Sequence, residues 1–377
     1  IEKNLSNILL NHDQARNWRQ VNTTILPLAA DQSNDQPFYK IMLEQEGMYR
    51  ITYDELQTAG APVGIIDPAT FQLFNQGEEI SILVSGQDDG NFDPEDEVVF
   101  FGQQLQSKYS KVNVYWLTWG EEPGLRMQSI DATTTGLASI PTSFFATHHA
   151  EMDLIYSSSH FIGEEKDHWF WKRAYATSST AFVEFQTELL NISPENQDVV
   201  IRGELKGYFA TPYHHALIYI NDNLIGDYTF SLGADFTFEV VVPSSLLIEG
   251  VNTLKMECLV DDPITVNGIY LNWFEIDLLN SFMAENDQID FTYNQAGTWE
   301  FRLDGFSSPD LEAYDLSDSN NPKIIQNFGI ETTANGQQLS FETTISSGQR
   351  FLVQASSKRL SPIDIIQDTP SQWKSSQ

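Results

Sequence analysis

Short segments with an apolar residue at every second position recur along most of this sequence. The clearest covers residues 254–260, where the alternate positions are Leu254, Met256, Cys258 and Val260. A spacing of two places these side chains on one face of a β-strand. Similar segments are separated by turn-forming residues, and no long helical pattern lies between them. The sequence therefore predicts a mainly β, multidomain fold built from antiparallel strands.

The strand signals fall into three successive blocks. We expect a β-rich N-terminal domain at residues 38–140, a jelly-roll-like β-sandwich at 177–280 and a smaller β-sandwich at 281–360. Residues 1–37 are polar and predicted to form an N-terminal arm. Residues 141–176 are predicted to connect two domains, and their aromatic run at 168–172 is expected to dock on a neighbouring domain.

Several local signals are specific enough to name single residues. Thr52 and Glu55 have the spacing of a capping box and predict a short helix that ends at Gly60. Residues 38–43 and 47–52 are expected to form a hairpin. Two further hairpins are predicted around residues 75–77 and 221–223.

Acidic residues dominate the charge. The chain has 53 Asp and Glu against 20 Lys and Arg, a formal net charge of −33. Such a charge repels nucleic acid and anionic membrane surfaces, so neither is an expected partner. No apolar run approaches the length of about 20 residues needed to span a membrane. The carboxylates remain available for hard cations such as calcium.

An acidic loop at residues 88–96 is the candidate calcium site. Asp89, Asn91, Asp93 and Asp96 could direct oxygen atoms towards one cation, as in calcium-binding loops. Pro94 stands where an EF-hand loop needs glycine, and no flanking helices are predicted. The alternative is an Asx-type turn that caps the strand beginning near residue 97.

A candidate carbohydrate site contains Tyr213, His214 and His215, because sugars stack on aromatic rings and bond to polar groups. The alternative is hydrogen bonding of the histidines in the core or at a sheet edge. His160, Glu164 and His168 are spaced for zinc on a helix, but their surroundings favour an irregular connector.

Several strings resemble the region ahead of the catalytic domain in gingipain-type cysteine peptidases, a family that includes the sortase-like members of type IX secretion. The resemblance covers about residues 38–373, in the same order. Its strings are GMYRI at 47–51, FQLFNQGEEI at 71–80, DEVVFFG at 96–102, NVYWL at 113–117, GLRM at 124–127, His214-His215 and EGVNTL at 249–254.

The resemblance implies a bacterial protein that is secreted or lies at the cell surface. It implies that residues 361–377 are a linker towards a missing peptidase domain, which would be the main partner, with secretion machinery or glycans as further partners. The chain itself is expected to be a non-catalytic accessory or pro-region. Its single thiol, Cys258, alternates with its neighbours like a buried residue and lacks the setting of a nucleophile. The alternative function is an extracellular carbohydrate-binding or adhesin-like module.

Overall fold

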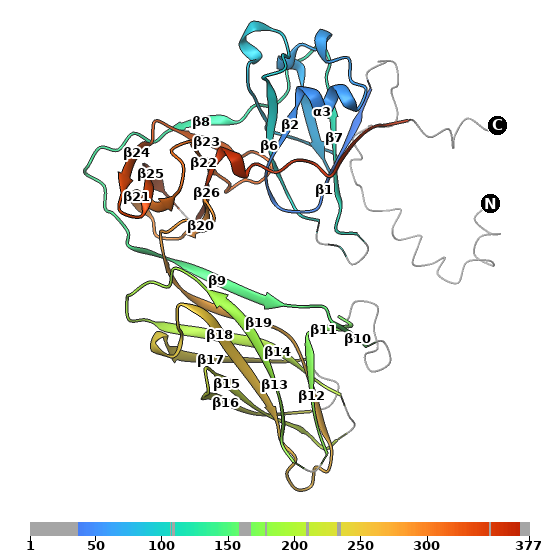
Figure 1. The fold of residues 1–377 in the computed structure, drawn as a ribbon, viewed down its shortest axis with the longest axis vertical. Helices are drawn as coiled ribbons and strands as arrows, with labels where there is room; N and C mark the ends of the chain where they lie inside the picture. Colours follow the sequence, from blue (N-terminus) through green and yellow to red (C-terminus); the bar gives the residue numbers. More distant parts are fainter. Residues whose placement is uncertain are drawn as a thin grey trace, which may run out of the picture. The chain divides into compact units, whose positions relative to one another are not determined.

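A computed structural model describes residues 37–105, 107, 110–157, 167–177, 179–208, 211–231, 235–346 and 348–369. The predicted arm, apart from residue 37, and the positions of His160 and Glu164 lie outside this part of the chain. Two compact units are present (Figure 1). Within the described residues, the first consists of 37–129, 318–324 and 357–369, and the second of 130–317 and 325–356. The mainly β, antiparallel fold predicted above is confirmed.

Two sheets and a short helix build the first unit. One sheet has the strand order β27-β1-β7-β3-β4 and the other the order β2-β6-β5. The elements are β1 (Tyr39–Leu43), β2 (Gly47–Thr52), α3 (Tyr53–Thr58), η1 (Val63–Ile65), η2 (Pro68–Thr70), β3 (Gln72–Asn75), β4 (Glu78–Ile80), β5 (Leu83–Val84), η3 (Gln87–Asp89), β6 (Glu97–Gly102), β7 (Asn113–Thr118) and β27 (Asp364–Gln367).

The local predictions for this unit have mixed outcomes. The capping box is confirmed, since Glu55 N–H donates to the Thr52 hydroxyl and the Glu55 carboxylate accepts from Thr52 N–H. The hairpin around Gln76 and Gly77 is confirmed, and both residues have positive φ as a tight turn requires. The hairpin of residues 38–43 with 47–52 is wrong. β1 pairs with β7 and β27 while β2 pairs with β6, so the two strands lie in different sheets, and both bury apolar side chains in the same core.

A large β-sandwich forms the first part of the second unit (Figure 1). Its sheets have the orders β12-β19-β14-β17, with β9 also paired to β19, and β13-β18-β15-β16. The elements are β9 (Ser143–Glu151), β10 (Ile155–Tyr156), β11 (Trp169–Phe170), β12 (Lys172–Ala176), β13 (Ala181–Leu189), β14 (Asp198–Gly207), β15 (His214–Ile220), β16 (Asn223–Phe230), β17 (Asp235–Pro243), η4 (Ser244–Leu246), β18 (Gly250–Cys258) and β19 (Asn267–Ser281). The residues expected to form a connector thus contribute β9 and β12 to this sheet.

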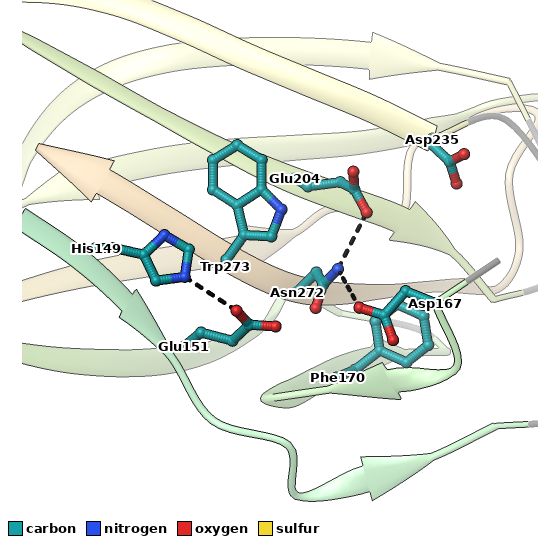
Figure 2. Close-up of a pocket in the computed structure, with 8 residues that line it drawn as sticks. All are labelled: His149, Glu151, Asp167, Phe170, Glu204, Asp235, Asn272 and Trp273. Carbon is teal, nitrogen blue, oxygen red and sulfur yellow. Dashed lines mark hydrogen bonds and ion pairs between the residues drawn. The ribbon is translucent and has the colours of Figure 1, made fainter. Parts of the chain in front are cut away.

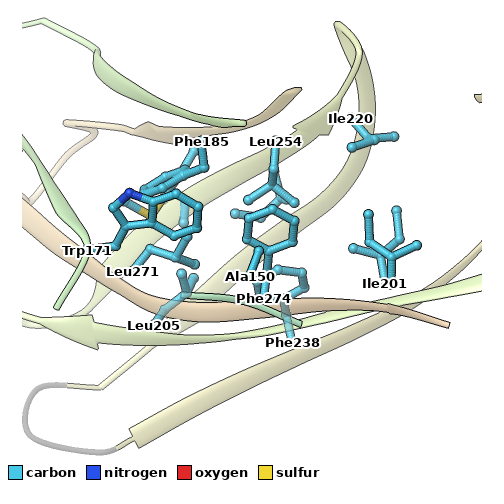
Figure 3. Packing of buried hydrophobic residues seen from close by; sticks show 14 of the residues in the cluster. Ala150, Trp171, Phe185, Ile201, Leu205, Ile220, Phe238, Leu254, Leu271 and Phe274 are labelled. Atoms are coloured by element: carbon cyan, nitrogen blue, oxygen red, sulfur yellow. The ribbon is translucent and has the colours of Figure 1, made fainter. Parts of the chain in front are cut away.

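The alternating segments supply the core between these two sheets. Phe185, Leu254 and Phe274 are fully buried, and Trp171 stacks on Phe274 with ring centroids 5.8 Å apart (Figure 3). Phe and Trp side chains of this size each bury on the order of 150–250 Å² and dominate the stability of a core. The aromatic run at 168–172 therefore docks into this sandwich through Trp171.

A second, smaller sandwich completes this unit. Its sheets have the orders β20-β26-β22-β23-β8 and β21-β25-β24, around a core rich in phenylalanine. The elements are β8 (Gln128–Asp131), β20 (Gln288–Tyr293), β21 (Gly297–Phe306), β22 (Leu311–Asp315), β23 (Lys323–Gln326), β24 (Gly329–Thr333), β25 (Gly336–Ile345), β26 (Gln349–Ala355) and η5 (Ser356–Lys358). Within the described residues, no helix is long and apolar enough to cross a membrane.

Strand β19 contains an irregularity that positions the pocket described below. Opposite β14, Gly203 pairs with Phe274 and Leu205 pairs with Leu271, so β19 has one extra residue between these pairs. This is a β-bulge, in which two residues oppose one on the neighbouring strand. Asn272 and Trp273 are the bulged residues, and they stand opposite Glu204. The apolar alternation of β19 changes phase at this point.

Candidate functional site

The acidic loop is held by its own short-range hydrogen bonds. The Asp89 carboxylate accepts from Asn91 N–H at 2.9 Å, and the Asp96 carboxylate accepts from Asp93 N–H at 2.9 Å. Asp96 is also buried, and its carboxylate lies against Gly86, whose φ is +72°. These contacts are those of an Asx-type turn ahead of β6.

Calcium binding by Asp89, Asn91, Asp93 and Asp96 stays a prediction. In the described parts of the chain, no group of three or more His, Cys, Asp or Glu side chains is arranged to hold a metal ion. Calcium also uses amide and main-chain oxygens, which that criterion leaves out.

The candidate carbohydrate residues are divided between two environments. His214 is fully buried, its Nδ1 lies 2.8 Å from Asn267 Oδ1, and its ring packs against Phe230. His215 points to the opposite side of β15, as neighbouring strand residues do. Its two ring nitrogens lie 2.8 Å from Asp261 and 2.7 Å from Asp227. Tyr213 is partly exposed just before β15. Tyr213 and His215 both interact with Asp261, whereas His214 points into the core. Carbohydrate binding by these residues stays a prediction.

Cys258 is the last residue of β18 and is fully buried in the sandwich core. Its strand neighbours are Ala181 on β13 and Ala216 on β15. Burial raises the pKa of the thiol to about 12. A cysteine nucleophile needs an accessible thiol with a lowered pKa. The prediction that Cys258 is a buried apolar residue is confirmed.

A pocket of about 440 Å³ opens on the outer face of the β9-β19-β14-β17 sheet (Figure 2). Five strands supply its lining, together with Asp167, which lies two residues before β11. The lining residues are His149, Glu151, Asp167, Phe170, Glu204, Asp235, Asn272 and Trp273. Four of these side chains are carboxylates and two are the aromatic rings of Phe and Trp, so the pocket combines acceptor groups with flat apolar surface.

The bulge in β19 explains why Asn272 and Trp273 both line this pocket. In a regular strand, adjacent side chains point to opposite faces of the sheet. The bulge places the apolar residues on either side of it, Leu271 and Phe274, in the core and leaves the two bulged residues for the outer face. The partner strand of β19 also changes here, from β12 at Leu271 to β9 at Trp273. Bulges are common next to functional sites because they redirect side chains.

One wall of the pocket, formed by His149 and Glu151, belongs to a network of ion pairs. The His149 ring lies 2.9 Å from Glu151 and 3.0 Å from Glu275, and it stacks on Trp273 with ring centroids 6.0 Å apart. Arg202 donates to Glu275 at 2.6 Å. Burial acts to lower the pKa of His149, but hydrogen bonds to Glu151 and Glu275 outweigh it and raise that pKa. Asp235, at another edge of the pocket, forms an ion pair with Lys206.

The floor of the pocket is less well satisfied. The Asn272 side-chain NH₂ donates to Asp167 at 3.0 Å and to Glu204 at 3.2 Å, so one amide lies between two carboxylates (Figure 2). Both donors of that amide are thereby used, which fixes its orientation. Asn272 is 3% exposed, and its Oδ1 has no hydrogen-bond partner among the described residues. A buried acceptor left without a donor costs about 1–3 kcal/mol of stability.

Sequence reasoning missed this pocket because its residues are spread from position 149 to position 273. One feature of the sequence does indicate the bulge in β19. Ile269 and Leu271 are apolar at odd positions, whereas Phe274 and Ile276 are apolar at even positions. Such a slip of the alternation by one residue marks a bulge, here at Asn272 and Trp273.

No protein-family model matches the sequence, and a search of curated proteins gives no match. Among solved structures, the chain is similar to dimeric latent PorU from Porphyromonas gingivalis. The TM-score is 0.64 and the sequence identity 13%, over 89% of this chain and 33% of that chain. The predicted resemblance is confirmed. The chain resembles the N-terminal part of PorU, a gingipain-like protein, and spans about a third of the length of PorU.

Carbohydrate-binding modules of family 35 give weaker matches. One from an environmental isolate has a TM-score of 0.24 and 13% identity, over 34% of this chain and 91% of the module. One from Clostridium thermocellum has a TM-score of 0.21 and 12% identity, over 36% of this chain and 90% of the module. Scores this low carry no argument about fold or ligand, and at 13% identity the likeness to PorU is a likeness of fold.

Proposed function

We propose that this chain is a non-catalytic accessory region of a secreted, gingipain-like bacterial cysteine peptidase. The observation that carries the proposal is the shared fold with the N-terminal part of PorU over 89% of the chain. The matched region is a third of that protein, so a separate catalytic domain would lie elsewhere in the parent. The region would assist folding, maintain latency or position substrate for that domain.

The state of the thiol supports the non-catalytic part of the proposal. The chain has one cysteine, and Cys258 lies between two strands in the sandwich core. Its raised pKa keeps it in the thiol form at neutral pH, and no substrate reaches it without separating the sheets. A cysteine peptidase in which this residue were the nucleophile would need a different fold around it.

Peptidase assays on the purified 377-residue chain test this. We expect no thiol-dependent cleavage of a mixed peptide library under reducing conditions, and the same baseline for Cys258→Ala. Cleavage by the native chain that is blocked by iodoacetamide and lost in Cys258→Ala would overturn the proposal. Circular dichroism of both proteins shows that each is folded when assayed.

A second experiment tests the link to a peptidase. The gene is sequenced beyond the codon for Gln377, and the full product is assayed with and without this region. We expect an in-frame caspase-like domain with a His-Gly dipeptide and a downstream Cys. An unrelated downstream sequence would contradict the accessory role. If the peptidase domain alone cleaves faster than the full product, and adding this chain slows it, latency is the role.

A further inference from the structure

The pocket on the outer face of the β9-β19-β14-β17 sheet is built to accept hydrogen bonds. Asp167 and Glu204 are acceptors when ionised, and the donors of Asn272 are already used on them. Asn272 Oδ1 has no donor within the described residues, but it is shielded from solvent, so the acceptors that a ligand can reach are the two carboxylates. A ligand that fits this floor must therefore bring hydrogen-bond donors for Asp167 and Glu204.

Charge favours a cationic ligand over a neutral one. Of the carboxylates that line the pocket, Glu151 is paired with His149 and Asp235 with Lys206. Among the described residues, Asp167 and Glu204 have no cationic partner. They share the neutral amide of Asn272, and Asp167 also accepts from Trp169 N–H at 2.9 Å. Two carboxylates this close repel each other unless a positive charge lies near both. The floor of the pocket is thus short of a positive charge.

Size and shape favour an organic cation over a metal ion. A pocket of about 440 Å³ is far larger than a single ion, and no metal-holding group of His, Cys, Asp or Glu was found in the described chain. Trp273 and Phe170 add aromatic surface beside the carboxylates (Figure 2). A guanidinium group has five N–H donors in one plane and stacks on aromatic faces, whereas an ammonium is a compact point charge.

We propose that this pocket binds a guanidinium group, presented by an arginine side chain of a peptide. The guanidinium would donate to the carboxylates of Asp167 and Glu204 and neutralise them while its plane lies against Trp273. This inference goes beyond the accessory role above and does not depend on it, because it rests only on residues of this chain.

The test is an NMR titration of the ¹⁵N-labelled chain with N-acetyl-L-arginine amide. The indole N–H signal of Trp273, assigned with Trp273→Phe among the 8 tryptophans, reports on the pocket. We expect a saturable shift with a Kd on the order of 1 mM, typical of a ligand of this size. N-acetyl-L-citrulline amide has the same shape without the charge, and we expect it to leave the signal unmoved.

Variants tie the binding to the floor of the pocket. We expect Asp167→Asn and Glu204→Gln each to weaken binding about tenfold, because each removes a charge that faces the guanidinium. Glu239→Gln is the matched control, because Glu239 is an exposed carboxylate on β17 that does not line the pocket. The Kd of this variant for the arginine probe should be unchanged. The other indole signals show whether each variant is folded.

Several results would overturn the proposal. These are no saturable shift with the arginine probe up to 50-fold above the expected Kd, an equal shift with citrulline, or unchanged affinity in both Asp167→Asn and Glu204→Gln. A shift produced by neutral monosaccharides but not by arginine would assign the pocket to carbohydrate instead. A peptide with one arginine between glycines tests whether the site accepts an arginine within a polypeptide. We expect it to bind at least as tightly as the small probe. Failure of the peptide to bind would contradict the peptide part of the proposal and limit the site to small molecules.

Discussion

The acidic loop in the first unit and the pocket in the second both gather carboxylates, yet they use them differently. In the loop, the carboxylates of Asp89 and Asp96 accept from main-chain N–H groups two or three residues away. In the pocket, Asp167 and Glu204 come from segments distant in sequence and share the amide of Asn272. Asp167 also accepts from Trp169 N–H, so it combines a local bond with a long-range one. The loop carboxylates stabilise their own backbone, and those of the pocket face a cavity.

This difference shows that the density of acidic residues in a sequence says little about a binding site. Local acceptors find local donors, since Asp and Asn side chains readily bond to nearby main-chain groups. A site is indicated where carboxylates from segments distant in sequence line one cavity without a cation, as Asp167 and Glu204 do within the described residues.

The largest expected effect tests whether the loop is structural. In Gly86→Ala, the added methyl group would meet the Asp96 carboxylate, and the φ of +72° would also become strained. We expect a loss of about 3 kcal/mol in the free energy of unfolding, from the left-handed backbone and the displaced Asp96 hydrogen bond. Urea denaturation of the whole chain measures this loss in the unfolding transition of the first unit.

Gly90→Ala is the control for this substitution. Gly90 has a φ of +80°, but a Cβ added there would meet no atom within 4 Å. Only the cost of the left-handed backbone, about 1 kcal/mol of unfolding free energy, therefore applies. Equal losses for the two variants would show that the contact with Asp96 contributes nothing.

Calcium is the next test of the loop. If Asp89, Asn91, Asp93 and Asp96 bind it with the weak affinity of extracellular modules, 10 mM calcium should stabilise the first unit by about 2 kcal/mol. Calorimetry with calcium and with excess EDTA measures this as a rise in Tm. The rise should vanish in Asp89→Asn/Asp93→Asn. A Tm that is the same in calcium and in chelator would remove the calcium prediction.

The third test contrasts one carboxylate from each region. Asp96→Asn weakens a charge-assisted hydrogen bond and should cost about 1 kcal/mol of unfolding free energy. Glu204→Gln relieves the repulsion with Asp167 and should stabilise the second unit by about 0.5 kcal/mol. Chemical denaturation at pH 7 measures both. The comparison fails if the two substitutions change stability in the same direction.

The smallest expected effect concerns the ion pairs of His215 with Asp261 and Asp227. Burial acts to lower the pKa of His215, but Asp261 and Asp227 outweigh it and raise that pKa. The stabilisation that these ion pairs give to the folded chain is therefore complete below the pKa of about 6.5 that His215 has in the unfolded chain. It is lost as the pH rises through the pKa of His215 in the folded chain. His215→Gln should lower stability by a few tenths of a kcal/mol more at pH 5.5 than at pH 8.5.

His148→Gln supplies the opposite case. Burial lowers the pKa of His148 and outweighs its hydrogen bond with Asn280, whose side-chain NH₂ lies 3.1 Å from Nε2. Its contribution is present above the unfolded pKa and is lost as pH falls through the folded pKa. Denaturation curves at the two pH values should therefore diverge in opposite directions for the two histidine variants, and parallel pH trends would contradict the assignment.

Local features of the fold were predictable from sequence, and long-range ones were not. The capping box at Thr52 and the burial of Cys258 follow from spacing alone. The pairing of β1 with β7 rather than β2 cannot be predicted from spacing. Strands of similar apolar pattern compete as partners, and packing in the core determines which of them pair. The candidate pocket belongs to the second class, since its floor joins Asp167, Glu204 and Asn272 across three segments of the chain.

The pairing of β27 with β1 has a mechanical consequence. Tyr39 at the start of β1 lies opposite Gln367 at the end of β27, and the two strands are antiparallel. A pull applied between these two residues would open the ladder like a zipper, one hydrogen-bonded pair at a time, at low force. Everything from β2 to β26 lies within the loop that this pair closes, so tension would release β27 before it reached either sandwich of the second unit.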